Sequence, residues 1–233
     1  MVPSDPDMMS ERLHIDSLHL ATFARRYSAG ELLADGFVHA LAIVAGLIAF
    51  PLLLWHALET SGIGSVAALA VYAAGFFLMF GFSLAYNMTP PSATKWLLRR
   101  LDHSMIYVMI AGTYTPVLVQ LESAAWAWAM GAVVWAGACA GILVKVALPG
   151  RYDRLSIIAY LLLGWVGLIA AVPASAALPS LSIWLLVAGG ATYAAGVGFH
   201  VWDRLRFQNV IWHLFVTIAA GLHFAAIAVA LAS

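Results

Sequence analysis

The sequence predicts an all-α fold, a bundle of seven transmembrane helices with its N-terminus in the cytoplasm and its C-terminus outside. Composition is the first observation: 64% of the residues are hydrophobic and 9% are charged, whereas soluble domains carry about 25% charged residues. A soluble fold of 233 residues could not bury so much apolar surface, but a bilayer can accommodate it. The second observation is that apolar runs long enough to cross a hydrocarbon core of about 30 Å occur seven times.

Each predicted span is an apolar run that ends where proline, glycine or charged residues cluster. The seven spans are residues 32–55, 63–87, 103–121, 124–147, 155–173, 180–201 and 210–231. Ser28 and Glu31 form an S-x-x-E capping box just before the first span, which predicts a helix start there. We therefore expect a cytoplasmic N-terminal tail over residues 1–30 and a membrane domain over residues 31–233.

The positions of the basic residues predict the orientation. All 11 Lys and Arg residues fall in the N-terminal tail or at the second, fourth and sixth loops. The loops on the other side carry only Glu59 and Glu122 as charged residues. Because cytoplasmic loops are enriched in Lys and Arg, the basic side is predicted to be cytoplasmic. We expect a multi-pass membrane protein with an orientation opposite to that of a G-protein-coupled receptor.

Three shorter segments add detail to this prediction. Residues 92–101 combine apolar and basic side chains, as expected of a short helix lying on the inner leaflet, and residues 11–27 show a weaker pattern of the same kind. Gly137 and Gly141 form a G-x-x-x-G, which indicates either a close helix contact or only the usual frequency of glycine in membrane helices. The formal net charge of zero indicates no nucleic-acid partner, and membrane lipids are the expected partners.

Polar side chains gather at the predicted cytoplasmic ends of the spans. A polar residue inside a membrane helix is costly and therefore suggests a function. They are Glu31, Asp35 and His39 on the first span, Ser83, Tyr86 and Asn87 on the second, Asp102 and His103 on the third, and Asn209 and His213 on the seventh, with His223 deeper. The topology places them at similar depths, so they could line one cavity on the intracellular side. Interhelical hydrogen bonds that only hold the bundle together are the alternative.

Five stretches of sequence, which follow one another in the family's order along the chain, resemble the hemolysin III family, the bacterial branch of the progestin and adipoQ receptor superfamily. They are Glu31-Leu-Leu-Ala-Asp-Gly-Phe-Val-His39, Ser83-Leu-Ala-Tyr86, the run from Leu101-Asp-His-Ser to Gly-Thr-Tyr-Thr-Pro116, Gly189-Gly-Ala-Thr-Tyr193 with Gly196, and Ile211-Trp-His213 through His223-Phe224. The resemblance implies a multi-pass protein of the bacterial inner membrane, with seven helices and the N-terminus inside. This orientation agrees with the separate argument from charge.

The resemblance also implies a zinc site in which three imidazoles bind the metal and an aspartate holds a metal-bound water. Ser83, Asp102 and His213 stand at the matching positions, but Asn87 and Asn209 replace the other two histidines. An amide oxygen is a poorer zinc ligand than an imidazole. Two outcomes stay open: Glu31, His39 or His103 could complete a metal site, or Asn87 and Asn209 could join Asp102 and His213 in a metal-free polar network.

Three functions follow from these features. The first is a role in membrane or lipid homeostasis, with a degenerate metal site at the cavity. The second is a zinc-dependent lipid amide or ester hydrolase, in which Asp102 orients the water, Ser83 positions the substrate and His213 binds the metal; whether the protein is an enzyme is left open. The third, pore-forming or haemolytic activity, is implied only by the family name. A bundle with no functional site is the remaining alternative.

Overall fold

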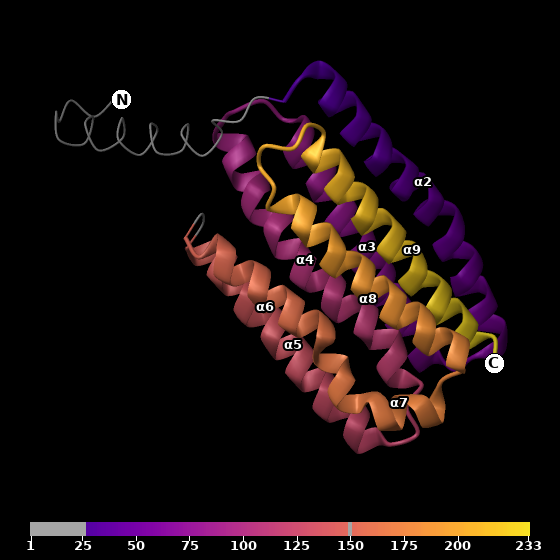
Figure 1. Ribbon diagram of the computed structural model, residues 1–233. Coiled ribbons are helices and arrows are strands. Elements are labelled where there is room, and N and C mark those ends of the chain that lie inside the picture. The colour runs from indigo at the N-terminus through magenta and orange to yellow at the C-terminus, as the bar shows by residue number, and fades with distance from the viewer. Residues whose placement is uncertain (1–26, 149–150) are drawn as a thin grey trace, which may run out of the picture.

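The computed structural model describes residues 27–148 and 151–233, and the regular structure in these two ranges is entirely helical (Figure 1). The elements are α2 (Ala29–Thr60), α3 (Ile63–Met88), α4 (Ala93–Val119), α5 (Ala124–Ala147), α6 (Asp153–Trp165), the 3-10 helix η1 (Val166–Ala170), α7 (Ala171–Ala177), α8 (Ser180–His200) and α9 (Gln208–Leu231). The long helices run roughly along one common direction and form a single bundle (Figure 1).

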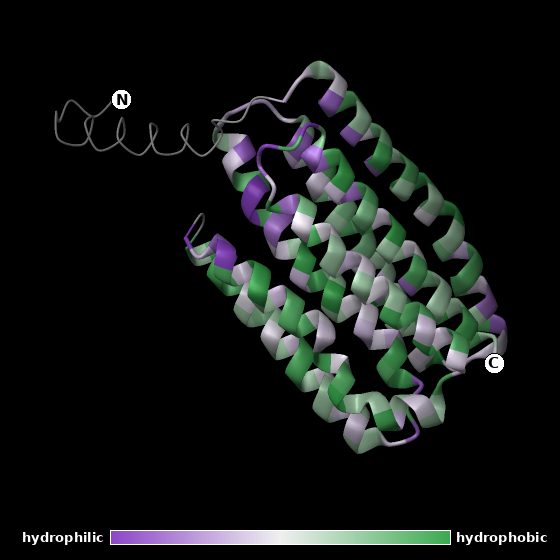
Figure 2. Ribbon diagram, in the orientation of Figure 1, coloured by the Kyte–Doolittle hydropathy of each residue, from purple (hydrophilic) through white to green (hydrophobic). Residues whose placement is uncertain are grey.

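Six helical segments in the described ranges are long and apolar enough to cross a membrane: α2, α3, α5, the continuous α6–η1–α7 segment, α8 and α9. Hydrophobic residues, coloured green, occur along the whole length of these helices (Figure 2). On α2, for example, the large exposed side chains include Leu33, Phe37, Leu41, Val44 and Ile48. Side chains of this kind are stable when they contact lipid, so the protein is a multi-pass membrane protein.

Helix α4 differs from the prediction in its length. The sequence predicted a separate inner-leaflet helix over residues 92–101, but α4 runs without a break from Ala93 to Val119 and packs between α3 and α5. Its start is capped by the Ser92 hydroxyl, which accepts a hydrogen bond from the Lys95 amide at 3.1 Å. The basic residues in its first turns lower its mean hydropathy, although the helix has the length of a membrane span.

The predicted span over residues 155–173 also has a different end. The 3-10 helix η1 interrupts it, and α7 then continues through Pro173 to Ala177. Proline is tolerated there because Pro173 lies in the first turn of α7, where its missing N–H would have no intrahelical partner. The predicted amphipathic segment over residues 11–27 lies, except for Tyr27, outside the described residues.

The capping box at the start of α2 is confirmed. The Glu31 amide donates to the Ser28 hydroxyl at 3.3 Å, and the Ser28 amide donates to the Glu31 carboxylate at 2.9 Å. The second carboxylate oxygen of Glu31 accepts from the backbone N–H of Phe207 at 3.0 Å. This contact ties the start of α2 to the turn before α9, where Phe207 adopts a left-handed backbone conformation with φ of 58°.

Close helix contacts bring the polar residues of α3 and α4 together. A Cβ added at Gly75 of α3 would lie 3.3 Å from the backbone oxygen of Val108, and one at Gly112 of α4 would lie 3.4 Å from the backbone oxygen of Val71. The two backbones therefore approach directly, as small residues allow in membrane helices. Helix α2 packs against both α3 and α9, so the four helices with the polar residues are neighbours.

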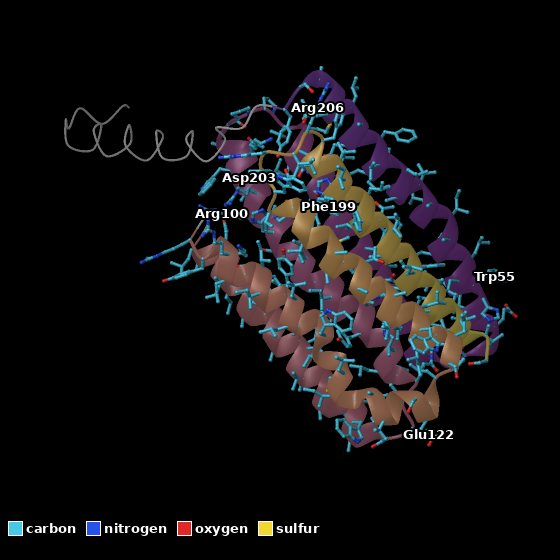
Figure 3. The ribbon with its side chains drawn as sticks, viewed as in Figure 1. Trp55, Arg100, Glu122, Phe199, Asp203 and Arg206 are labelled. Atoms are coloured by element: carbon cyan, nitrogen blue, oxygen red, sulfur yellow. The ribbon has the colours of Figure 1, made fainter. Side chains whose placement is uncertain are left out.

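An ion-pair cluster joins three helices at the basic end of the bundle. Asp153 at the start of α6 accepts from Arg99 of α4 at 2.6 Å and from Lys145 of α5 at 2.7 Å. Both cationic side chains are largely buried. Arg100, Asp203 and Arg206 lie at this end, and Glu122 lies at the opposite end (Figure 3).

The G-x-x-x-G of α5 makes close contacts with neighbouring helices, which confirms the first of the two interpretations of this motif. A Cβ at Gly137 would lie 2.8 Å from the Leu163 side chain of α6, and one at Gly141 would overlap the ring of Tyr107. The structure thus gives both glycines a packing role. At Gly221 of α9, by contrast, an added Cβ would meet nothing within 4 Å.

We predict that Gly141→Ala destabilises the bundle by about 2 kcal/mol, because the added methyl group must displace a packed aromatic ring. Gly221→Ala is the matched control and should be neutral or slightly stabilising, because alanine favours helix more than glycine does. Thermal unfolding of both variants in detergent measures the difference. Equal melting temperatures for the two variants would contradict this packing role.

Candidate functional site

Buried polar side chains from α2, α3 and α9 form a cluster near the basic end of the bundle. Asp35 and His39 come from α2, Ser83 and Asn87 from α3, and His213 from α9, and each is at most 9% exposed. Asn209 stands one helical turn before His213 and is partly buried. Buried polar groups in a membrane protein need partners, so their hydrogen bonds decide what the cluster can do.

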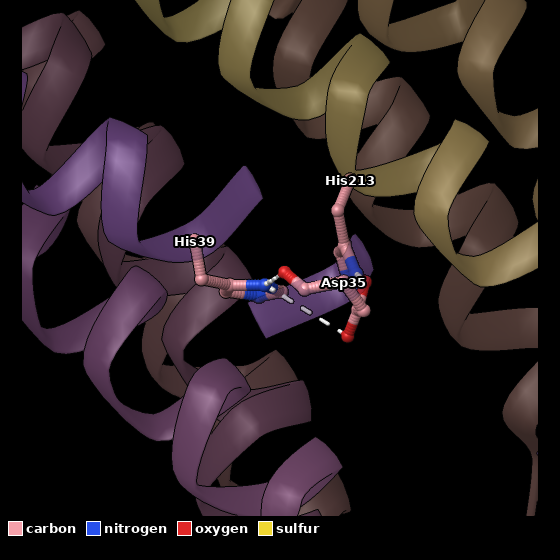
Figure 4. A group of neighbouring side chains, drawn as sticks. All are labelled: Asp35, His39 and His213. Carbon is pink, nitrogen blue, oxygen red and sulfur yellow. Dashed lines mark hydrogen bonds and ion pairs between the residues drawn. The ribbon is translucent and has the colours of Figure 1, made fainter. Parts of the chain in front are cut away.

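Asp35 contacts both histidines (Figure 4). Its carboxylate Oδ1 lies 2.5 Å from Nδ1 of His213, and its backbone oxygen lies 2.8 Å from Nδ1 of His39. A carbonyl oxygen and an ionised carboxylate only accept hydrogen bonds, so Nδ1 carries the proton in both rings. In each neutral ring Nε2 is then left with a free lone pair. On His213 this Nε2 lies 3.4 Å from the Ser83 hydroxyl, and on His39 it is buried without a hydrogen-bond partner.

The two asparagines hydrogen-bond to each other. Asn209 Nδ2 donates to Asn87 Oδ1 at 2.9 Å, and it lies 3.5 Å from Oδ2 of Asp35. Asn87 Nδ2 donates to the backbone oxygen of Ser83 at 2.9 Å and lies 3.4 Å from the Ser83 hydroxyl. Because the backbone oxygen of Ser83 can only accept, the orientation of the Asn87 amide follows from this network.

A cavity of about 1310 Å³ extends from this cluster along the interior of the bundle. At one end its lining includes Ser83, Asn87, Asp102, Asn209 and His213. Its opposite end is lined by apolar side chains, among them Val117, Leu118, Leu121, Met130 and Leu178. His39 also faces the cavity, whereas Asp35 lies behind His213 and is not part of the lining. The cavity is therefore polar at one end and apolar at the other.

The other predicted site residues lie at different distances from the cluster. Asp102 and His103 line the cavity from α4, with 4.0 Å between the carboxylate and the imidazole, and Asp102 also interacts with Ser83. His223 lines it deeper along α9, where its Nε2 lies 3.1 Å from the Leu186 backbone oxygen. Glu31 lies outside the cavity lining, at the start of α2, where it binds Ser28 and Phe207.

Several charged residues that line the cavity were not predicted as site residues, among them the ion-paired Arg99, Lys145 and Asp153. Their ion pairs join residues far apart in the sequence. The only sequence signal for these pairs is that the predicted spans place the three residues at a similar depth in the membrane. Lys95, in the first turn of α4 and before its apolar part, also lines the cavity and donates to the backbone oxygens of Tyr86 and Thr89. Burial lowers the pKa of the Lys95 ammonium group, and the Asp102 carboxylate opposes that shift.

The residues present do not fit a zinc site of three imidazoles, because two of its positions are amides bonded to each other. Asp35, His39 and His213 offer ligand atoms within 4.8 Å of one another and so form a possible metal-binding triad. Zinc holds its nitrogen and oxygen ligands at about 2.0–2.2 Å, which keeps two ligand atoms roughly 3 Å apart or more. The 2.5 Å between Asp35 and His213 is shorter and is the distance of a strong hydrogen bond.

Comparisons with known proteins agree with the resemblance found in the sequence. Residues 31–224 match the family described as Haemolysin-III related. Hemolysin-3 of Bacillus cereus is 34% identical over 195 residues, which cover 83% of this chain and 89% of that protein. The Hemolysin-3 homolog of Bacillus subtilis is 30% identical, with 82% of this chain and 89% of that protein covered. The human Monocyte to macrophage differentiation factor is 28% identical, with coverages of 83% and 82%. No solved structure matches.

Proposed function

This chain belongs to the hemolysin III family, and we propose that it acts in membrane or lipid homeostasis by binding a membrane lipid in its internal cavity. The polar part of the lipid lies at the cluster of Ser83, Asn87 and His213, and the acyl chain extends toward the apolar end. The two amide positions leave the family's metal site degenerate, so binding relies on hydrogen bonds from the cluster.

The gradient of polarity along the cavity is the observation that carries this proposal. A pocket for a drug-sized ligand measures about 300–1,000 Å³, and the volume here, about 1310 Å³, exceeds that range. One end of the lining offers amide, hydroxyl, imidazole and carboxylate groups, and the other is lined mainly by alkyl and aromatic groups. A lipid with one polar head and a long chain matches both ends.

We further propose seven spans, with α4 as the seventh, and the polar cluster on the cytoplasmic side of a bacterial inner membrane. The described basic residues support this orientation, because they lie at the end of the bundle that holds the cluster. They are Lys95, Arg99, Arg100, Lys145, Arg151, Arg154, Arg204 and Arg206. The positive-inside rule places that end in the cytoplasm and the C-terminus outside.

The orientation predicts which new cysteines a membrane-impermeant maleimide reaches in spheroplasts. In a Cys139→Ala background, Glu122→Cys should react because residue 122 faces the outside. Arg206→Cys should react only after the membrane is permeabilised. Both native side chains are exposed, so burial would not explain a difference. The reverse labelling pattern would show the opposite orientation.

We predict that Val187→Trp lowers the amount of lipid that copurifies with the protein at least several-fold, because Val187 lines the cavity and the indole ring would fill part of it. Leu181→Trp is the matched control on the same helix, because Leu181 is 58% exposed on the outer face. Native mass spectrometry of protein in nanodiscs counts bound lipids for each variant. Equal lipid content in both variants would mean that the cavity does not hold the lipid.

A zinc-dependent lipid amide or ester hydrolase is the second candidate, and the nearness of Asp35, His39 and His213 favours it. In that case hydrolysis of a ceramide-like amide or an acyl ester should stop when a chelator is added. It should also stop in His39→Gln, although that variant still binds lipid. Hydrolysis that persists under both conditions would exclude zinc at this triad. Haemolysis stays a prediction from the names of the relatives.

A further inference from the structure

We infer that Ser83, His213 and Asp35 form a nucleophile, a general base and an orienting carboxylate, and that they transfer the acyl group of a lipid in the cavity through Ser83 without a metal ion. This inference rests on the proposed function, because the acyl donor is a lipid bound in the cavity. Lipid binding alone, however, does not require a nucleophile.

The three side chains form one continuous line of contacts across three helices. Ser83 Oγ on α3 lies 3.4 Å from Nε2 of His213 on α9, and Nδ1 of the same ring lies 2.5 Å from the carboxylate of Asp35 on α2. Activated nucleophiles have this arrangement: a hydroxyl, a base within reach of it, and a third group that orients the base. The distance between hydroxyl and imidazole is longer than an ordinary hydrogen bond, and such contacts shorten when substrate binds.

The placement of each group relative to the cavity matches its role. Ser83 and His213 line the cavity, where they meet a bound lipid, whereas Asp35 lies behind the imidazole and is 2% exposed. The Asp35 carboxylate accepts a hydrogen bond from Nδ1–H of His213 and so keeps the proton on that nitrogen. The lone pair of Nε2 then faces the serine. His39 restricts the imidazole from another side, because the two rings pack edge to face with centroids 4.3 Å apart.

The asparagines that replace histidines have a role in this arrangement. Asn87 Nδ2 lies 3.4 Å from Ser83 Oγ and has a second hydrogen beyond the one it donates to the backbone. That N–H is placed to stabilise the oxyanion that forms when Ser83 attacks a carbonyl. Asn209 donates to the oxygen of the same amide and fixes its orientation. An imidazole ligand at position 87 would direct its lone pair toward the cavity and could not serve as this donor.

The reaction consists of two balanced steps. In the first step Ser83 Oγ attacks the carbonyl carbon of an ester or amide, and the serine proton passes to Nε2 of His213. The bond from the carbonyl carbon to the leaving oxygen or nitrogen then breaks, and the leaving group takes the proton from His213. A water molecule next attacks the acyl-serine and gives its proton to His213. The bond to Oγ breaks, Oγ regains the proton, and a free fatty acid leaves. Asp102 also faces Ser83 from α4.

An alkyl fluorophosphonate tests the first step directly. Its phosphorus forms a bond to the nucleophilic oxygen, the P–F bond breaks, and the serine proton passes to the base. Protein in nanodiscs with a chelator present should gain one adduct per chain, located at Ser83 by peptide mass spectrometry. Ser83→Ala should gain none. Ser104→Ala should react like the unmodified protein, because the buried Ser104 hydroxyl binds only the backbone of its own helix.

The role of Asp35 has its own variants. Asp35→Asn should slow adduct formation by roughly 100-fold or more, because an amide no longer fixes the proton on Nδ1. Asp35→Glu should recover part of the rate, because it restores a carboxylate beside the imidazole. A purely structural role for Asp35 would not distinguish the amide from the longer carboxylate.

Three results would overturn the inference: no adduct on protein that still binds lipid, an adduct that survives Ser83→Ala, or an adduct that a chelator abolishes. The first of these leaves the proposed lipid binding intact. Failure of the proposed function gives a different result, in which the protein copurifies with no lipid and an added fatty acid does not slow the labelling.

Discussion

The buried contact between Asp35 and His213 is the interaction on which the rest of the site depends. A carboxylate inside a membrane bundle is costly unless it has close partners. Asp35 has three: the His213 ring at 2.5 Å, the Asn209 amide at 3.5 Å and the His39 ring, which also binds its backbone oxygen. These contacts join α2 to α9 and set the proton positions of both imidazoles. Removing Asp35 would therefore affect both the packing of the helices and the chemistry of the cavity.

The amides at positions 87 and 209 are compatible with this hydrogen-bonded arrangement. Imidazoles there would complete a set of three nitrogen ligands, whereas the amides bond to each other and to Ser83. The backbone oxygen of Ser83 can only accept, so it fixes the orientation of the Asn87 amide, and the Asn87 oxygen in turn accepts from Asn209. Hydrogen bonds that are linked in this way reinforce one another and favour a single arrangement. The same contacts that make a three-imidazole site impossible thus hold Ser83 and His213 in place at the polar end of a lipid-sized cavity.

Particular residues show how far the sequence alone could predict this structure. The capping box at Ser28 and Glu31 depends on local chemistry and could be predicted, as could the apolar spans. The continuity of α4 could not, because Arg99 looks like a boundary residue until Asp153 of another helix pairs with it. Asp35 and His39 stand four residues apart, so their spacing alone places them on one face of a helix. The bond from Asp35 to His213 joins positions 178 residues apart, so no local pattern could predict it.

Elemental mass spectrometry of protein purified without a polyhistidine tag tests the central claim, that this site is held by hydrogen bonds and not by a metal. The unmodified protein should contain no stoichiometric zinc. The double variant Asn87→His with Asn209→His restores three imidazoles and should bind about one zinc ion per chain. Near one zinc in the unmodified protein, lost in His213→Ala, would contradict the claim and make the family's metal chemistry the function to explain.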